Sequence, residues 1–207
     1  TLILGDNSAS FTGSARLEVG EGSVRVTHAG SLGAATVTAR IGQGAALELA
    51  TAGWAPTATL VQMPGSFERW AVDGARSGNI TLPAGVGLQV KQNQTSTQTI
   101  TLNGGSVMGY VPRDWDHVAV IQKLGAGVTL SLAADSSLGQ PFVSSNNGVW
   151  DYAYFDLGKQ NTNGFDININ DAYLRGSYLQ IDGAITGAFN LTKVGKDVIL
   201  LAGANTH

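Results

Sequence analysis

Short segments in which apolar and polar residues alternate recur along the whole chain, and glycine interrupts nearly every candidate helix between them. They include LEV at 17, VRV at 24, TVTA at 36, LEL at 47, ITL at 80, LQV at 88, ITL at 100, VTL at 128, ININ at 167 and LQI at 179. A period of two is the signal of a half-buried strand. The 28 glycines, and charged residues at only 13%, favour tight turns over charged helices. The sequence therefore predicts an all-β chain without long helices.

Several of these segments also repeat at a longer interval. ITL at 80–82 returns at 100–102, GVGLQV at 85–90 returns as GAGVTL at 125–130, and GEGSVRV from Gly20 returns as GQGAALEL from Gly42. Self-similarity at such a period indicates stacked repeats, in which each coil pairs with the coils above and below it. We expect a parallel β-helix (β-solenoid) of roughly ten coils of about 20 residues, in a rod of about 50 Å. An antiparallel sandwich with hairpin turns is the alternative.

The expected coil assigns a side to each strand residue. Alternate apolar residues should point inward and stack on their equivalents. This inward set includes Leu17, Val19, Leu47 and Leu49. Glu18 and Glu48, which lie between them, should face water. Glycine and asparagine should occupy the corners, where the backbone needs a positive φ.

Charge and composition exclude several classes of function. The net charge of −3 gives no basic face for nucleic acid. The absence of cysteine excludes disulfides, thiolate metal sites and cysteine nucleophiles. No run of about 18 apolar residues predicts a membrane-spanning helix, and no motif predicts a cofactor. Since the sequence begins at Thr1 without a charged and apolar leader, any signal peptide is expected to have been removed or to lie outside it.

The segment LQIDGAITGAFNLTKVGKDVILLAGANTH, residues 179–207, resembles the autotransporter-associated β-strand repeat. In that repeat an I-x-G-x-I-x-G turn leads into G-L-T-K-x-G-x-G-x-L-x-L-x-G-x-N-T-Y. Residues 1–50 resemble its continuation, from an N-T-Y-T-G element to a closing G-A-x-L-x-L. His207 replaces the usual aromatic residue, and Lys196-Asp197 replaces a small glycine-containing pair. Residues 51–178 match only as generic β-coils, with loop insertions expected around 110–117 and 140–165.

The resemblance implies a right-handed parallel β-helix in the passenger region of a bacterial surface protein, which a separate C-terminal barrel carries outward. The lack of cysteine is similar to many such passengers, which cross the outer membrane unfolded. We therefore expect a single, non-enzymatic β-helix segment over residues 1–207, outside the cell or on its surface. Its role would be that of a stalk, scaffold or adhesive fibre.

Two polar and aromatic clusters are candidates for ligand or partner contact. In VPRDWDHV, Asp114 and Asp116 would share one strand face as a carboxylate pair for sugar hydrolysis, beside Trp115 and His117; a charged loop is the simpler interpretation. In WDYAYFD, one strand face carries three aromatic rings that could stack on sugars or pack under a loop. These are Trp150, Tyr152 and Tyr154. Both clusters support the alternative function, a polysaccharide-binding or polysaccharide-cleaving β-helix.

The run DININD superficially resembles a calcium loop, with Asp166, Asn168 and Asn170 at alternate positions. Its sixth position is Asp171 where glycine is needed, and its twelfth is Ser177 where a glutamate belongs. A strand with a polar outer face fits the run better. No metal site is predicted.

The two ends of the sequence resemble each other. Gly5-Asp6-Asn7-Ser8 aligns with Gly203-Ala204-Asn205-Thr206, and each follows an apolar run. If both ends are interior coils of one repeat, each exposes unpaired strand groups and the cut face of the core. The sequence therefore predicts head-to-tail stacking, either of repeats in one chain or of separate subunits, with the strands near Leu200 and Leu2 pairing across the junction. The candidate contact residues are Leu2, Leu4, Ile199, Leu200 and Leu201.

Overall fold

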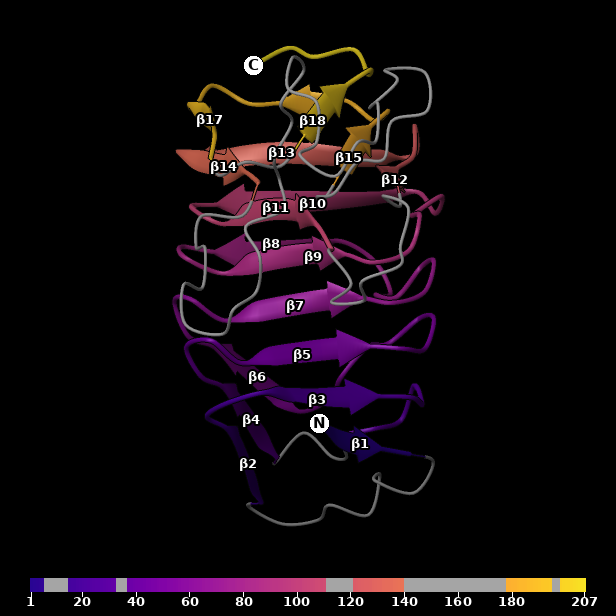
Figure 1. Cartoon of the computed structure of the whole chain (residues 1–207), viewed down its shortest axis with the longest axis vertical. Coiled ribbons are helices and arrows are strands. Elements are labelled where there is room, and N and C mark those ends of the chain that lie inside the picture. Colours follow the sequence, from indigo (N-terminus) through magenta and orange to yellow (C-terminus); the bar gives the residue numbers. More distant parts are fainter. Residues whose placement is uncertain (6–14, 33–36, 111–120, 140–177, 195–197) are drawn as a thin grey trace, which may run out of the picture.

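A computed structural model describes residues 1–5, 15–32, 37–110, 121–139, 178–194 and 198–207 (Figure 1). Every regular element in these ranges is a β-strand. The prediction of an all-β chain is confirmed. No helix that could cross a membrane is found in the part of the chain that the structure describes.

The largest sheet has eight strands, and its members alternate along the sequence with strands of the other sheets. In spatial order they are β1 (Leu2–Leu4), β3 (Ser23–Val26), β5 (Ala46–Leu49), β7 (Phe67–Trp70), β9 (Gly87–Val90), β11 (Ser106–Gly109), β14 (Ser136–Leu138) and β17 (Leu191–Lys193). Figure 1 shows this sheet as a ladder along the long axis, with β1 near one end and β17 near the other.

Three smaller sheets contain the remaining strands. One has β2 (Arg16–Val19), β4 (Thr38–Ile41) and β6 (Thr59–Gln62). Another has β8 (Ile80–Pro83), β10 (Gln98–Asn103), β13 (Val128–Ala134) and β16 (Ile185–Thr186). The third has β12 (Ile121–Leu124), β15 (Tyr178–Ile181) and β18 (Val198–Leu201).

Every pair of neighbouring strands in the described ranges is parallel, so the antiparallel sandwich is wrong. The repeated ITL segments lie side by side, with Ile80 paired to Ile100 and Leu82 to Leu102. GEGSVRV and GQGAALEL also pair, through Val24 and Leu47. The predicted equivalence of GVGLQV and GAGVTL is wrong, because β9 belongs to the eight-stranded sheet and β13 to the sheet of β8 and β10.

The step along the sequence between paired strands is nearly uniform over the first half of the chain and longer afterwards. Ser23 pairs with Ala46, and Gly87 pairs with Ser106. In the later part Gln98 pairs with Val128, and Leu130 pairs with Ile185. Because the later steps are longer, the largest sheet has eight strands, fewer than the number of coils expected from a uniform step. The insertions expected at 110–117 and 140–165 lie, apart from Tyr110, outside the described residues.

The inward residues of successive strands form apolar columns. Val24, Leu47, Leu88 and Val107 occupy one column in register, and each is fully buried. The expected inward positions of Leu47 and Leu49 are thus confirmed, while Leu17 and Val19 at one end are half-buried. Glu18 is exposed as expected. Strands β5, β9 and β11 are buried at all four positions rather than at alternate ones, a pattern typical of parallel sheets covered on both faces.

Glycine supplies the special backbone at the corners as predicted, but asparagine does not. Among the described residues, those with a positive φ are glycines except for Leu32, at 80°. Two of the described asparagines instead use their side chains to bond to a neighbouring strand. Asn79 Oδ1 accepts a bond from the Thr99 N–H at 2.8 Å, and Asn93 Oδ1 accepts one from the Lys123 N–H at 2.9 Å. These amides satisfy strand donors where the ladder is interrupted.

Glycines allow a close approach of successive layers just after β12, β15 and β18. A Cβ added at Gly125 would lie 2.9 Å from the Gln94 carbonyl oxygen, and one added at Gly183 would overlap the Val128 carbonyl oxygen. At Gly203 it would overlap the Gly183 oxygen. Each of these glycines therefore makes room for the backbone of the neighbouring layer, which explains their recurrence.

We expect Gly183→Ala to destabilise the protein by about 1–3 kcal/mol or more, because backbone atoms must move to relieve the overlap. Gly20→Ala is the matched control, since its Cβ would meet nothing within 4 Å and its φ is not positive. Urea denaturation followed by circular dichroism measures both. Equal unfolding midpoints for the two variants would contradict the close approach at Gly183.

Asp73 ties one corner to the next. Its Oδ1 accepts a hydrogen bond from the Thr95 N–H at 2.7 Å, and its Oδ2 accepts one from the Thr95 hydroxyl. Burial raises the pKa of the Asp73 carboxyl, but hydrogen bonds from Thr95, Ser96 and Gly74 outweigh it and leave the pKa below its ordinary value of 3.8.

This lowered pKa predicts a pH-dependent contribution to stability. A carboxyl whose folded pKa is lower than its unfolded pKa stabilises the fold fully above the unfolded value, and the contribution is lost as pH falls through the folded pKa. The stability difference between the wild type and Asp73→Asn should therefore shrink below about pH 4. Urea titrations over the acidic range measure it, and Thr95→Val, which lacks the hydroxyl donor, should weaken the same dependence. A difference independent of pH would refute the assignment.

Candidate functional site

The sequence-predicted contact residues fall outside the described part of the chain. These are Asp114, Trp115, Asp116, His117, Trp150, Tyr152 and Tyr154. The run from Asp166 to Asp171 lies outside it as well. Their roles therefore stay predictions. Within the described ranges no three His, Asp or Glu side chains are grouped as metal ligands.

A buried ion pair interrupts the apolar column of the eight-stranded sheet. Glu68 in β7 pairs in register with Leu47 on one side and Leu88 on the other, so its carboxylate points inward, and it is 1% exposed. Arg76 donates to both carboxylate oxygens at 2.8 Å. The Trp70 indole N–H donates to Oε1 at 2.7 Å, and Gln62 donates to Oε2 at 3.3 Å. Glu68 therefore has a full set of partners inside the core.

The guanidinium of Arg76 is held from its other side by an aromatic ring. Its Cζ lies 4.6 Å from the ring centroid of the fully buried Trp54, and the two backbones form a parallel bridge. The Trp54 indole donates to the Ser31 carbonyl oxygen at 3.2 Å. The cluster joins segments from different passages of the chain, and its polar groups are occupied by one another. The cluster therefore holds neighbouring layers together from inside the core. The one feature of the sequence that indicates it is Glu68, a charged residue at a strand position equivalent to the apolar Leu47.

Breaking this pair from one side should be costly. Arg76→Leu leaves Glu68 buried without its cation, and we expect a loss of about 3–5 kcal/mol. The double variant Glu68→Leu/Arg76→Leu should recover part of that loss, because no buried charge remains. Thermal and urea denaturation of the single and double variants form the cycle. If the double variant were less stable than Arg76→Leu, the stabilisation by this cluster would not depend on the pairing of the two charges.

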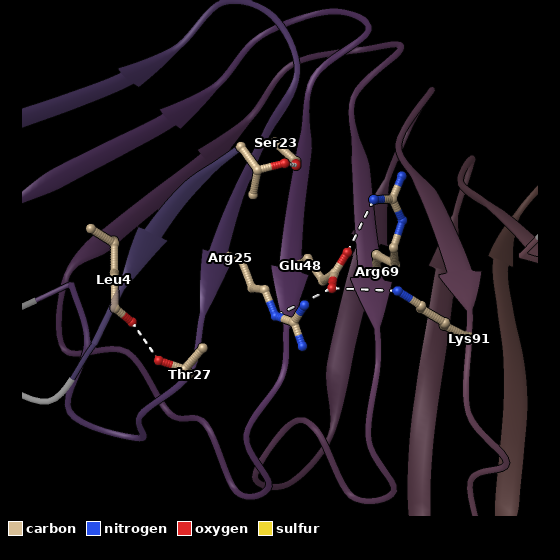
Figure 2. A network of polar contacts seen from close by, with 8 residues as sticks. Leu4, Ser23, Arg25, Thr27, Glu48, Arg69 and Lys91 are labelled. Carbon is tan, nitrogen blue, oxygen red and sulfur yellow. Dashed lines mark hydrogen bonds and ion pairs between the residues drawn. The ribbon is translucent and has the colours of Figure 1, made fainter. Parts of the chain in front are cut away.

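A second network corrects the expectation that Glu48 faces water. Glu48 is on the outward side of β5 but is buried, and cationic side chains from neighbouring strands surround it (Figure 2). Its Oε2 lies 3.2 Å from Arg69 Nη1, and its Oε1 lies 3.6 Å from both Arg25 Nε and Lys91 Nζ. The carboxylate thus neutralises charges that would otherwise repel one another along the sheet.

Most of the exposed large apolar side chains gather at the two ends of the sheets. Those described are Leu2 (51% exposed), Ile3 (62%), Val61 (37%), Phe189 (46%), Leu200 (42%) and Leu201 (41%). Leu2 and Ile3 belong to β1, Leu200 and Leu201 to β18, and Phe189 lies just before β17. We call β1 and β2 the N-terminal end and β17 and β18 the C-terminal end; they lie at opposite ends of the long axis in Figure 1.

The apolar core extends to the outermost described strands at both ends of the long axis. Leu2 is half exposed, whereas Val24, its partner in the next strand, is fully buried. At the C-terminal end Leu201 is 41% exposed, whereas its partner Ile181 is fully buried. Leu2 and Leu201 therefore have the inward position of a core residue, and no further strand of the described sheets covers them.

The backbone is open at the same places. Among the described residues, β1 pairs with β3 alone, β17 with β14 alone and β18 with β15 alone. Each outermost strand thus has one edge whose N–H and C=O groups have no strand partner in the described sheets, which makes it a template for a further strand. Of the predicted contact residues, Leu2, Leu200 and Leu201 are exposed, while Leu4 is buried in the core and Ile199 packs against it.

No family model, no curated protein and no solved structure matches this chain.

Proposed function

We propose that this chain is a structural segment of a β-solenoid, a right-handed parallel β-helix that assembles end to end. The winding is supported by the parallel eight-stranded sheet, whose strands recur along the sequence with one or two strands of the other parallel sheets between them. The step between paired strands is nearly uniform in the first half of the chain. The right hand is supported by the general rule that crossovers between parallel strands of one sheet are right-handed in about 98% of cases.

The observation that carries the assembly is the exposed core at both ends. Leu2 and Leu201 leave apolar surface in water, whereas Val24 and Ile181, their partners in the neighbouring strands, are fully buried. Burial of apolar surface contributes roughly 25 cal/mol per Å². The proposed partner is a second copy of this chain, because in the described sheets the N-terminal end offers the edge of β1 beside Leu2, and the C-terminal end offers the edge of β18 beside Leu201. Contacts between unlike ends propagate along one axis without closing.

The location belongs to the same proposal. The likeness of residues 1–50 and 179–207 to the autotransporter-associated repeat supports a place on the bacterial surface or outside the cell, in a stalk, scaffold or adhesive fibre without enzymatic activity. Antibody labelling of intact and permeabilised source cells tests this. Labelling that requires permeabilisation would reject it.

Assembly predicts rods that lengthen with protein concentration. Sedimentation velocity of the full chain across a hundredfold concentration range should show a growing sedimentation coefficient. Leu2→Ser and Leu201→Ser should each weaken association roughly four- to tenfold, since covering the exposed half of each side chain contributes about 0.8–1.5 kcal/mol.

The matched control is Val61→Ser, since Val61 is an exposed apolar residue of β6, away from the two ends. It should leave the association constant unchanged. A chain that stays monomeric at every concentration would refute end-to-end assembly. So would association that is weakened by Val61→Ser but unchanged by Leu2→Ser and Leu201→Ser.

A further inference from the structure

We infer that the junction between two copies is a parallel pairing of β1 of one copy with β17 of the next, which continues the eight-stranded sheet. This inference rests on the proposed assembly and specifies its partner strands. It replaces the sequence-based expectation that Leu2 and Leu200 pair. β1 is the first strand of the eight-stranded sheet, whereas Leu200 in β18 belongs to the three-stranded sheet of β12 and β15.

The order of the sheet decides which edges can meet. β1 and β17 are its two outermost strands, at opposite ends of the long axis (Figure 1). All the pairings between them are parallel, so every strand of the sheet runs in one direction. A copy placed above β17 in the same orientation presents β1 parallel to it, at the usual strand spacing of about 4.8 Å. A pairing of β1 with β18 would instead join two different sheets.

The register of the sheet predicts which residues face each other across the junction. Leu2 pairs with Val24, and this inward column continues through Leu47 and ends where Leu138 pairs with Lys193. The column therefore places Leu2 of the next copy beside Lys193. One residue further, Ile3 falls beside Val194. The Val194 N–H already donates to the Leu138 carbonyl oxygen at 2.8 Å, so the ladder extends past the last residue of β17.

The position of Ile3 also accounts for its exposure. Ile3 pairs with Arg25, which in turn pairs with Glu48, so it lies in the outward column of the sheet. At 62% it is the most exposed of the large apolar residues described. Beside Val194 of a second copy it would gain an apolar neighbour on an adjacent strand, and such cross-strand pairs contribute about 0.2–1 kcal/mol.

Disulfide crosslinking tests this register, because the chain has no cysteine of its own. Neighbouring parallel strands bring paired Cα atoms within the roughly 4.4–6.8 Å that a disulfide needs. Single variants Ile3→Cys and Val194→Cys are mixed at an assembling concentration and oxidised mildly. We expect a crosslinked heterodimer that dilution below the assembly range abolishes. Ile3→Cys mixed with Leu200→Cys should give none.

The double variant Ile3→Cys/Arg25→Cys is the positive control, since these residues already pair within one chain. Two outcomes would overturn the β1–β17 junction and leave end-to-end assembly intact. One is crosslinking of Ile3→Cys with Leu200→Cys instead of Val194→Cys. The other is assembly without any crosslink while the positive control reacts. Crosslinks of Ile3→Cys to itself would reveal head-to-head contact and overturn both. Absence of assembly in sedimentation would also overturn both.

Discussion

The structure depends on the in-register stacking of strands that come from successive passages of the chain. Each inward side chain lies above and below an equivalent, so the core is a set of columns rather than a closed globule. The column of Val24, Leu47, Leu88 and Val107 is one example. A layer is fully buried when it has neighbours on both sides. This single constraint explains both the complete burial of the middle and the exposed apolar residues at the two ends.

The same stacking determines how charge is accommodated. Glu68 takes a position in the column that is otherwise apolar, and it is tolerated because Arg76, Trp70 and Gln62 satisfy its carboxylate. Glu48 is buried on the outward face of the sheet and is surrounded by Arg25, Arg69 and Lys91. Buried charges are expensive unless paired. Both carboxylates therefore make the fold depend on cations contributed by other passages of the chain, which favours one register over its neighbours.

The corners between strands impose a second requirement on the sequence, because successive layers must also fit together there. Gly183 and Gly203 lie where the backbones of adjacent layers approach too closely for a Cβ. The side chains of Asp73, Asn79 and Asn93 instead bond to backbone N–H groups of the next layer. Corners thus carry part of the contact between layers. This gives small and amide residues there a structural reason that is independent of any ligand.

The sequence by itself determined the all-β class, the repeat period of the first half of the chain and the inward apolar positions, because these follow from local alternation and from glycine spacing. It also predicted exposed apolar residues at both ends, through the resemblance between residues 1–8 and 199–206, and Leu2, Leu200 and Leu201 are exposed. Local sequence could not predict that Glu48 is buried, since its three cationic neighbours come from β3, from β7 and from the residue that follows β9. Nor could it assign β13 and β18 to their sheets. Sheet membership depends on the length of each connection, and the longer connections that precede β13 and β16 shift the later strands away from a uniform repeat. Tertiary pairing alone decided that β1 and β17 are the two outermost strands of the eight-stranded sheet.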